Sequence, residues 1–228
     1  KERLSIARDR AAQTMAEMVT YLLATAADRR ADPHDDVISL LATVEVDGDT
    51  LGDTELAMFL VQLLVAGNAT TRNALSGGLV AFAENPDQWS RLRNEPSLLG
   101  TAVDEVLRWT TPVVYFMRTT TREVTIGDVT LPAGTPVVLH YLAANRDEAE
   151  FGPTSERFDI GREPNHHVAF GSGPHFCLGA ALARIELRAM LEALAARFAS
   201  IESAGPVERS MSLVIGGVRR APLGLTEG

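Results

Sequence analysis

The sequence contains a single cysteine, Cys177, and lacks any long apolar run. One cysteine cannot form a disulfide within the chain, so a reducing cytoplasm is the expected location. The longest apolar segment, residues 56–66, is interrupted by Gln62. It falls short of the roughly 18 residues that a membrane span needs. The N-terminal residues are charged and amphipathic, so no signal peptide is expected.

Positive charge is also scarce. The 228 residues include 21 Lys and Arg against 30 Asp and Glu, which gives a net charge of −9. This balance argues against nucleic acid as a partner. With 46% hydrophobic residues, the chain is long enough for one large domain with a sizeable core. No internal repeat and no low-complexity segment is visible.

The hydrophobic pattern predicts a mainly α fold with small β-sheets, of the α+β class. Apolar residues at helical spacing predict one helix from residue 1 to about 29 and a short one over 37–43. A polar segment, 44–52, predicts a loop or small hairpin. The remaining helices are expected over 53–84, 98–109 and from 180 onward, and strands over 113–117, 124–126 and 136–142.

The most distinctive segment of the sequence is Phe-Gly-Ser-Gly-Pro-His-Phe-Cys-Leu-Gly, residues 170–179. Its three glycines and Pro174 cannot occupy a regular helix or strand, so a tight loop is expected. Strong helix formers follow from Ala180. Cys177 therefore lies near a helix N-terminus, where unpaired N–H groups and the helix dipole favour a thiolate. A stabilised thiolate is a metal ligand.

Several other functions are possible for this loop. Phe176 stands where a dinucleotide-binding fingerprint needs its third glycine, and Ser172 does not lie in G-x-S-x-G. The Gly-Lys-Ser/Thr of a P-loop is missing. Zinc would need three or four ligands, and only His166, His167 and His175 lie near. A buried structural cysteine remains the ordinary alternative.

The same ten residues resemble the haem-binding loop of the cytochrome P-450 family, F-G-x-G-x-H-x-C-x-G. The matching positions are Phe170, Gly171, Gly173, His175, Cys177 and Gly179. The resemblance implies haem b as cofactor, with Cys177 as the iron ligand that favours O–O cleavage. It also implies that Arg118 and His175 bind the haem propionates. Residues 1–228 would form the C-terminal part of a single cytochrome P-450 domain whose N-terminal part is absent.

A second segment, residues 66–71, interrupts the long helix with Gly67, Asn68, Thr70 and Thr71. These residues weaken a helix or bond back to its carbonyls, which predicts a kink or bulge. Close helix packing would explain them equally well.

This segment resembles the family's oxygen-binding motif, Ala/Gly-Gly-x-Asp/Glu-Thr-Thr. Ala66, Gly67, Thr70 and Thr71 match it, and Ala69 replaces the usual carboxylate. By resemblance Thr70 assists oxygen activation, with Thr71 and Gly67 beside it and Ala66 against the haem. Protons would travel through water, Asn68 or a substrate hydroxyl; otherwise oxygen activation is impaired.

A third motif is Glu105-x-x-Arg108, which alone would be an ordinary surface pair. It is followed in the family's order by Ser-Glu-Arg-Phe at residues 155–158. The resemblance implies that Glu105, Arg108 and Arg157 form a buried structural triad behind the cysteine loop. By the same resemblance Ala69 would line the substrate pocket, together with Val113, Val114, Phe116, Met117 and Val214.

The resemblance implies a haem-thiolate monooxygenase that inserts one atom of O₂ into an apolar small molecule, of lipid, terpenoid, steroid or polyketide type. Electrons from NAD(P)H would arrive through ferredoxin reductase and a ferredoxin, which would dock near the cysteine, where Arg184 and Arg188 add positive charge. The alternative is a non-oxygenating haem-binding module or an impaired, truncated scaffold. His140, His166 and His167 are expected to be structural histidines.

Overall fold

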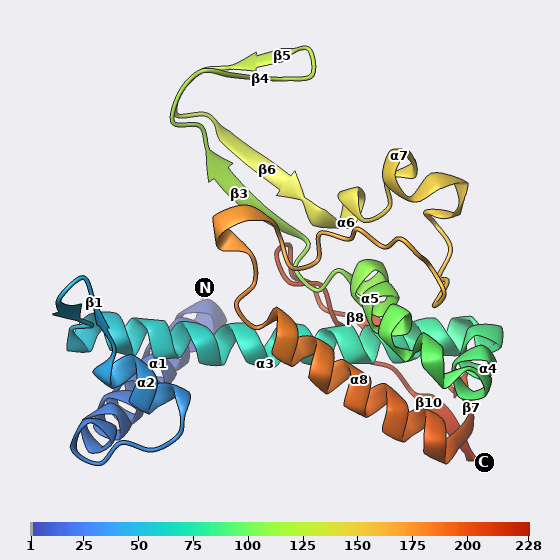
Figure 1. Cartoon of the computed structure of the whole chain (residues 1–228), viewed down its shortest axis with the longest axis horizontal. Coiled ribbons are helices and arrows are strands. Elements are labelled where there is room, and N and C mark those ends of the chain that lie inside the picture. Colours follow the sequence, from blue (N-terminus) through green and yellow to red (C-terminus); the bar gives the residue numbers. More distant parts are fainter. Residues whose placement is uncertain (1) are drawn as a thin grey trace. The chain divides into compact units, whose positions relative to one another are not determined.

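The computed structural model describes the backbone of residues 2–228, and the side chains of residue 6 and residues 8–228 (Figure 1). The chain divides into two compact units, residues 1–68 and residues 69–228. Helix α3 (Asp53–Glu84) belongs to both, and each unit is described by itself.

The first unit is built from helices and one small hairpin. It comprises α1 (Glu2–Ala31), α2 (Val37–Thr43), β1 (Glu45–Val46), β2 (Asp49–Thr50) and the start of α3. Six apolar side chains from the three helices form its core, namely Leu22, Ala26, Ala42, Leu56, Leu60 and Val61. Asp47 and Gly48 take positive φ angles in the turn of the hairpin, as a two-residue hairpin loop requires.

Polar contacts fix the helix ends of this unit. Asp36 caps α2 by accepting a hydrogen bond from the Ser39 N–H at 2.7 Å. The other oxygen of the Asp36 carboxylate accepts from the Arg29 Nε at 2.6 Å. Arg30 pairs with Asp53 at the first residue of α3, also at 2.6 Å.

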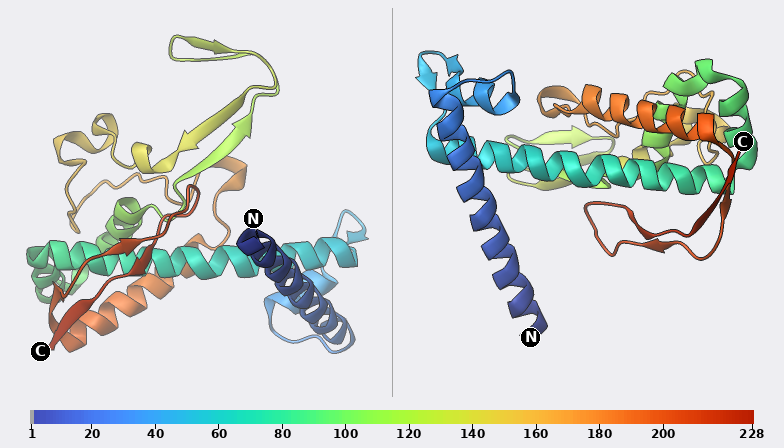
Figure 2. Two further views of the ribbon diagram at one scale, coloured as in Figure 1. Left: turned by 180° about the vertical axis from the view of Figure 1, so that it is seen from behind. Right: turned by 90° about the horizontal axis from the view of Figure 1, so that it is seen from below.

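The second unit holds the main core. Helices α4 (Pro86–Asn94), α5 (Leu99–Thr110) and α8 (Ala180–Arg197) surround the second part of α3, and η1 (Pro96–Leu98) links α4 to α5. Phe82 packs edge-to-face on both Trp89 and Phe158, with ring centroids 5.1 and 5.2 Å apart. Leu187 and Leu191 bring α8 into this core, and Figure 2 shows α8 beside α3.

The described sheets are antiparallel pairs. They join β3 (Tyr115–Thr119) with β6 (Pro136–His140), β4 (Val124–Ile126) with β5 (Val129–Leu131), β7 (Phe198–Ser203) with β10 (Leu223–Glu227), and β8 (Glu208–Arg209) with β9 (Val218–Arg220). Tyr115 lies opposite His140, and Thr119 opposite Pro136. The connecting helices are α6 (Tyr141–Ala144), α7 (Glu148–Phe151), η2 (Gly152–Thr154) and η3 (Gly173–His175).

The expected mainly α fold with small sheets is confirmed. The strand predicted over 113–117 begins two residues late, at Tyr115, and the one predicted over 136–142 ends at His140. The latter strand stops because His140 caps α6: its Nδ1 accepts the Ala143 N–H at 3.1 Å. Helix α3 continues as α-helix through residues 66–71, where a kink or bulge was predicted (Figure 1).

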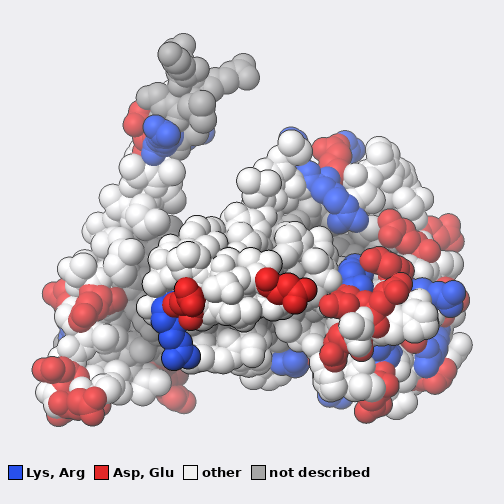
Figure 3. Space-filling model, turned by 90° about the horizontal axis from the view of Figure 1, so that it is seen from above, with Lys and Arg blue, Asp and Glu red and all other residues white. Residues whose placement is uncertain are grey.

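Charges on the molecular surface are mixed. Figure 3 shows a face on which acidic and basic side chains are interspersed with uncharged ones. Among the helices of residues 2–228, none has the length and apolar character that crossing a membrane would require.

Candidate functional site

Two glycines shape the loop that carries Cys177. Gly171 and Gly173 both have φ of +72°, a conformation that side-chain-bearing residues rarely adopt. The short turn η3 begins at Gly173 and ends at His175, two residues before the cysteine. The Cys177 N–H then donates to the Phe170 carbonyl at 2.9 Å, which closes the loop. Helix α8 starts directly after Gly179, so Cys177 lies just before its N-terminus.

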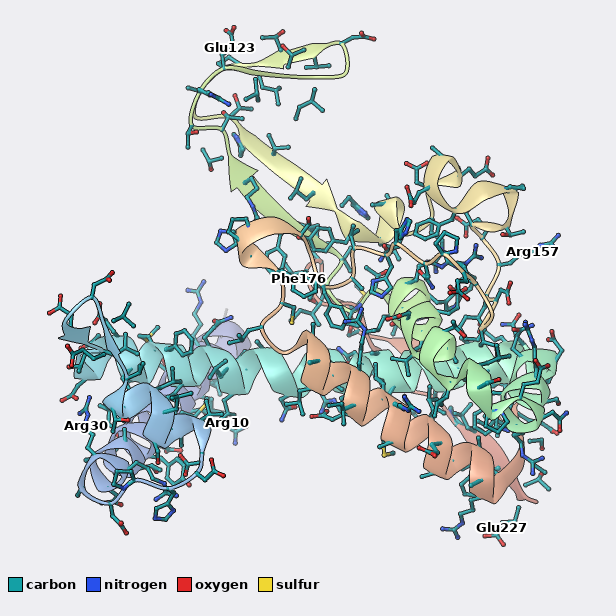
Figure 4. All side chains as sticks on the ribbon, in the orientation of Figure 1. Arg10, Arg30, Glu123, Arg157, Phe176 and Glu227 are labelled. Atoms are coloured by element: carbon teal, nitrogen blue, oxygen red, sulfur yellow. The ribbon has the colours of Figure 1, made fainter. Side chains whose placement is uncertain are left out.

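The sulfur is presented outward among apolar side chains. Cys177 is a free, exposed thiol. The side chains on either side of it are also exposed, Phe176 by 52% and Leu178 by 78%. Figure 4 shows the loop that carries Phe176 above the start of α8. Exposed apolar residues flanking a thiol fit a flat, apolar group that lies against the loop.

The chemistry of the donor set fits a metal carried by a macrocycle. Within the described residues, no three His, Cys, Asp or Glu side chains gather in a group that could hold a bare metal ion. Cys177 could therefore provide one ligand, and the remaining ligands would come from a ring such as a porphyrin. The residues present thus fit a haem.

The segment before the loop is anchored by two side-chain amides that the sequence did not single out. The fully buried Asn145 accepts the Val168 N–H at 2.8 Å and donates to Thr111 at 2.9 Å. Asn165 donates to Glu105 at 3.1 Å. These hydrogen bonds hold the segment before the loop in a fixed position against the helical core.

Glu105 is the centre of this anchoring. It lies on α5, is fully buried, and receives two hydrogen bonds from Arg108 at 2.7 and 2.8 Å. The Asp159 N–H and the Arg162 Nε donate to it as well, at 2.8 and 3.2 Å. These bonds satisfy a charge that would be costly to bury alone.

The third arginine of this cluster is not the predicted one. The Arg157 side chain is exposed and projects away from the protein (Figure 4). Its carbonyl, not its guanidinium, takes part, because it accepts from Arg108 and Arg162 at 2.8 and 3.1 Å. The Arg162 side chain, 8% exposed, points inward instead. The triad is therefore Glu105, Arg108 and Arg162.

A further arginine closes the end of α5. Arg146 donates to the carbonyls of Arg108 and Trp109 at 3.1 and 2.8 Å, and its guanidinium lies 4.1 Å from the Trp109 ring centroid. Burial, and after it the positive charge of Arg108, lower the pKa of Arg146 to about 10. The helix end is satisfied at the point where Thr111 takes a left-handed conformation.

The structure brings most of the predicted pocket residues together. Val113 pairs with Ile215 in a β-bridge, and the Val114 N–H donates to the Val214 carbonyl at 2.8 Å. The Phe116 ring lies 6.0 Å from the Tyr141 ring. Phe116, Met117 and Val214 are exposed, by 49%, 51% and 41%. Phe116 and Met117 are consecutive on β3 and so point to opposite faces of the strand, which leaves only one of them on the side of any single pocket.

A cavity of about 550 Å³ lies beside this group. Most of its lining residues are of polar type, although apolar atoms make up the larger part of the lining surface, and the residues are Arg72, Asn73, Ser76, Ser210, Ser212, Ile215, Val218 and Arg219. The residues predicted for oxygen chemistry precede it on α3. Ala69, Thr70 and Thr71 are half-buried in the second unit, while Ala66 and Gly67 belong to the first.

The predicted propionate ligands and docking arginines differ in how far they are engaged. His175 is exposed in η3, and Arg118 on β3 donates to the neighbouring Met117 carbonyl at 2.9 Å. Arg184 is held by Asp104 at 2.9 Å, whereas Arg188 is exposed. Apart from the Arg184–Asp104 ion pair, charged or polar atoms remain accessible on His175, Arg118 and Arg188.

Comparison with known proteins gives concordant matches. The family model described as "Cytochrome P450" matches residues 1–222. A "Putative cytochrome P450 126" of Mycobacterium tuberculosis is 43% identical over 216 residues, which are 93% of this chain and 52% of that protein. A "Methyl-branched lipid omega-hydroxylase" of Mycobacterium bovis is 41% identical over 213 residues, 92% of this chain and 50% of the relative.

A solved structure agrees. The crystal structure of CYP109E1 from Bacillus megaterium in complex with testosterone superposes with a TM-score of 0.91 at 35% identity, over 96% of this chain and 61% of that one. The chain thus spans about half the length of the curated relatives it matches.

Proposed function

Because this chain belongs to the cytochrome P450 family, we propose that it forms the haem-thiolate part of a monooxygenase that uses O₂ to oxidise an apolar small molecule. The observation that carries the proposal is the exposed Cys177 sulfur, held in a glycine loop that is bonded to the helical core. Haem b, when bound, supplies the redox chemistry that activates oxygen.

The residues of the chain would supply binding, orientation and proton control. Cys177 would hold the iron, and its environment would set the electron density that the sulfur donates. Arg118 and His175 would bind the two propionates as cations or hydrogen-bond donors. Thr70 would hold a proton through its hydroxyl near the reacting oxygen. Ala69 has no proton to give, so the transfer would pass through water, Asn68 or the substrate.

Several apolar side chains support an apolar substrate. Val113, Val114, Phe116, Met117 and Val214 offer few polar atoms, so burial of apolar area would drive substrate binding. Relatives named for a methyl-branched lipid and bound to testosterone support a lipid or steroid skeleton.

Electrons would come from NAD(P)H through a ferredoxin reductase and a ferredoxin in the cytoplasm. Arg188 is the better candidate than Arg184 for docking the acidic ferredoxin, because Arg184 is already paired with Asp104. Charge complementarity of this kind mainly raises the rate of association.

The absorption spectrum of the haem-loaded, reduced, carbon-monoxide-bound protein tests the proposal. A strongly red-shifted Soret band is expected for thiolate ligation, and Cys177→Ser should abolish it. Ser172→Ala, which changes an exposed hydroxyl in the same loop, is the matched control and should keep it. A wild-type band typical of histidine ligation would overturn the proposal.

The absence of a carboxylate at Ala69 favours a second candidate, a haem-binding protein that does not oxygenate substrate with O₂. Turnover driven by NADPH with a surrogate ferredoxin separates the two. Product formed in proportion to NADPH consumed supports the monooxygenase. NADPH consumption that yields only peroxide supports the alternative.

A further inference from the structure

Asp104, the residue before Glu105 on α5, connects both sides of the cysteine loop. Its Oδ1 receives hydrogen bonds from the Arg184 Nε at 2.9 Å and from the His167 Nε2 at 3.3 Å. His167 precedes the loop, and Arg184 lies on α8 after it. One carboxylate oxygen therefore ties the chain entering the loop to the helix that leaves it.

The His167 side of this connection leads directly to the loop backbone. The His167 Nδ1 accepts the Ala169 N–H at 3.2 Å, so this nitrogen carries no proton. The proton then lies on Nε2, which donates to Asp104. Only 3% of the His167 side chain is exposed. Asp104 thus selects the tautomer and fixes the ring that positions Ala169, the residue before Phe170.

The Arg184 side leads to the same place. The Arg184 guanidinium carbon lies 4.6 Å from the centroid of the Phe170 ring. The centroid of the His167 ring lies 5.8 Å from the same Phe170 centroid. Both partners of Asp104 therefore contact Phe170. The Phe170 carbonyl accepts the Cys177 N–H at 2.9 Å, so the position of Phe170 sets the backbone that carries the sulfur.

The Asp104 carboxyl is ionised near neutral pH. Burial alone would raise the pKa of its carboxyl, but hydrogen bonds from His167 and Arg184 outweigh burial and hold this pKa below the usual value. An ionised oxygen can accept both bonds together. Glu105, the next residue on α5, has a different set of partners, because it accepts hydrogen bonds from Arg108, Arg162 and Asn165.

We propose that Asp104 is a positioning residue for the Cys177 thiolate, acting through His167, Arg184 and Phe170. This inference rests on the proposed haem-thiolate function. Without the carboxylate, Phe170 would lose two of its constraints, and the bond between its carbonyl and the Cys177 N–H would become less defined. The thiolate would then be displaced from the iron more readily.

The test compares Asp104→Asn with Asp159→Asn in the haem-loaded protein. Asp159 is a matched control, because its Oδ1 also receives two bonds at 3.0 Å, from Arg91 and from the Gly161 N–H. Its connection to the loop anchors runs through its backbone N–H, which donates to Glu105 and which the substitution keeps. The readout is the rate at which the red-shifted carbon monoxide band converts to the band of displaced thiolate. For Asp104→Asn this rate should rise about tenfold, equivalent to one lost charged hydrogen bond.

Two further readouts add to this rate: the reduction potential of the haem, and the recovery of slow conversion in the variant Asp104→Glu. Asp104→Asn should shift the potential, Asp159→Asn should not, and Asp104→Glu should restore the slow conversion. Conversion and potential unchanged from wild type in Asp104→Asn, or changed equally in the control, would overturn the positioning role alone. A wild-type protein without the red-shifted band would overturn the proposed function as well.

Discussion

Glu105 and Arg108 form a fully buried, two-bonded ion pair, with the Arg108 Nε and Nη2 at 2.7 and 2.8 Å from the two carboxylate oxygens. The Arg108 Nη1 donates to the carbonyls of Asn145 and Ser155, at 2.6 and 2.8 Å. The pair therefore holds two other segments of the chain against α5, one at Asn145 and one from Ser155 to Asp159. Removing one member would leave a buried charge without its partner.

Arg162, and not Arg157, should therefore carry the stability of this cluster. Arg162→Met removes a buried donor to Glu105 and should lower the free energy of unfolding by about 3 kcal/mol. Arg157→Met removes only an exposed side chain and should change it by less than about 0.5 kcal/mol. Urea unfolding followed by circular dichroism measures both, and equal losses in the two variants would contradict the assignment.

The sequence predicted the long helices well, but it missed α4, the short helices α6 and α7, the strands β5 and β7 to β10, and the partner within this cluster. Helical periodicity placed α2 at its observed ends and α3 from Asp53 to the residue before Asn85-Pro86. Arg157 and Arg162 lie in one irregular segment, where no periodicity tells which side chain turns inward. The motif order therefore suggested the wrong arginine, and only the fold shows that Arg157 contributes its carbonyl.

The anchors of the loop were missed for a related reason. Asn145, Asn165 and Asp104 are single polar residues whose partners lie 23, 60 and 63 positions away in the chain. Contacts over such separations leave no local pattern. The glycine loop itself could be predicted, because positive φ angles at Gly171 and Gly173 impose a residue type that is visible in the sequence.

The two loop glycines should differ in their response to alanine. Both have φ of +72°, but a Cβ at Gly171 would lie 3.2 Å from the Tyr141 Oη, whereas one at Gly173 would meet nothing within 4 Å. Gly173→Ala should cost only backbone strain, about 1 kcal/mol in stability. Gly171→Ala should cost more, and Tyr141→Phe in the same chain should recover part of the difference. Identical unfolding curves for the two alanine variants would refute the Tyr141 contact.

Acid should weaken the first unit through Asp36. A hydrogen bond from Arg29 and one from the Ser39 N–H lower the pKa of Asp36 to about 2. An acid with a depressed folded-state pKa stabilises the fold above its unfolded pKa of about 3.9, and this contribution disappears as pH falls toward 2. Asp36→Asn should flatten the stability profile between pH 4 and 2, measured by thermal unfolding at each pH. Asp35→Asn, at an exposed neighbouring position, is the control and should keep the wild-type slope.

Thr70 and Ala69 should control the coupling of electron use to product formation, if the protein is the proposed monooxygenase. Thr70→Ala removes a hydroxyl that would hold a proton at the reacting oxygen, so the yield of product per NADPH should fall several-fold, and peroxide should rise in proportion. Thr70→Ser should retain most of the coupling. Ser76→Ala removes another hydroxyl from α3, one that donates to the Arg72 carbonyl at 2.9 Å, and should leave the yield unchanged.

The reverse experiment adds a proton donor. Ala69→Asp places a carboxyl beside Thr70 on the same helix. If proton delivery limits the reaction, the substitution should raise product per NADPH in the wild-type background but not in Thr70→Ala, because the added proton still needs the hydroxyl to reach the oxygen. A gain of equal size in both backgrounds would show that the carboxyl acts independently of Thr70. No gain in either would place the limiting step elsewhere than in proton transfer along α3.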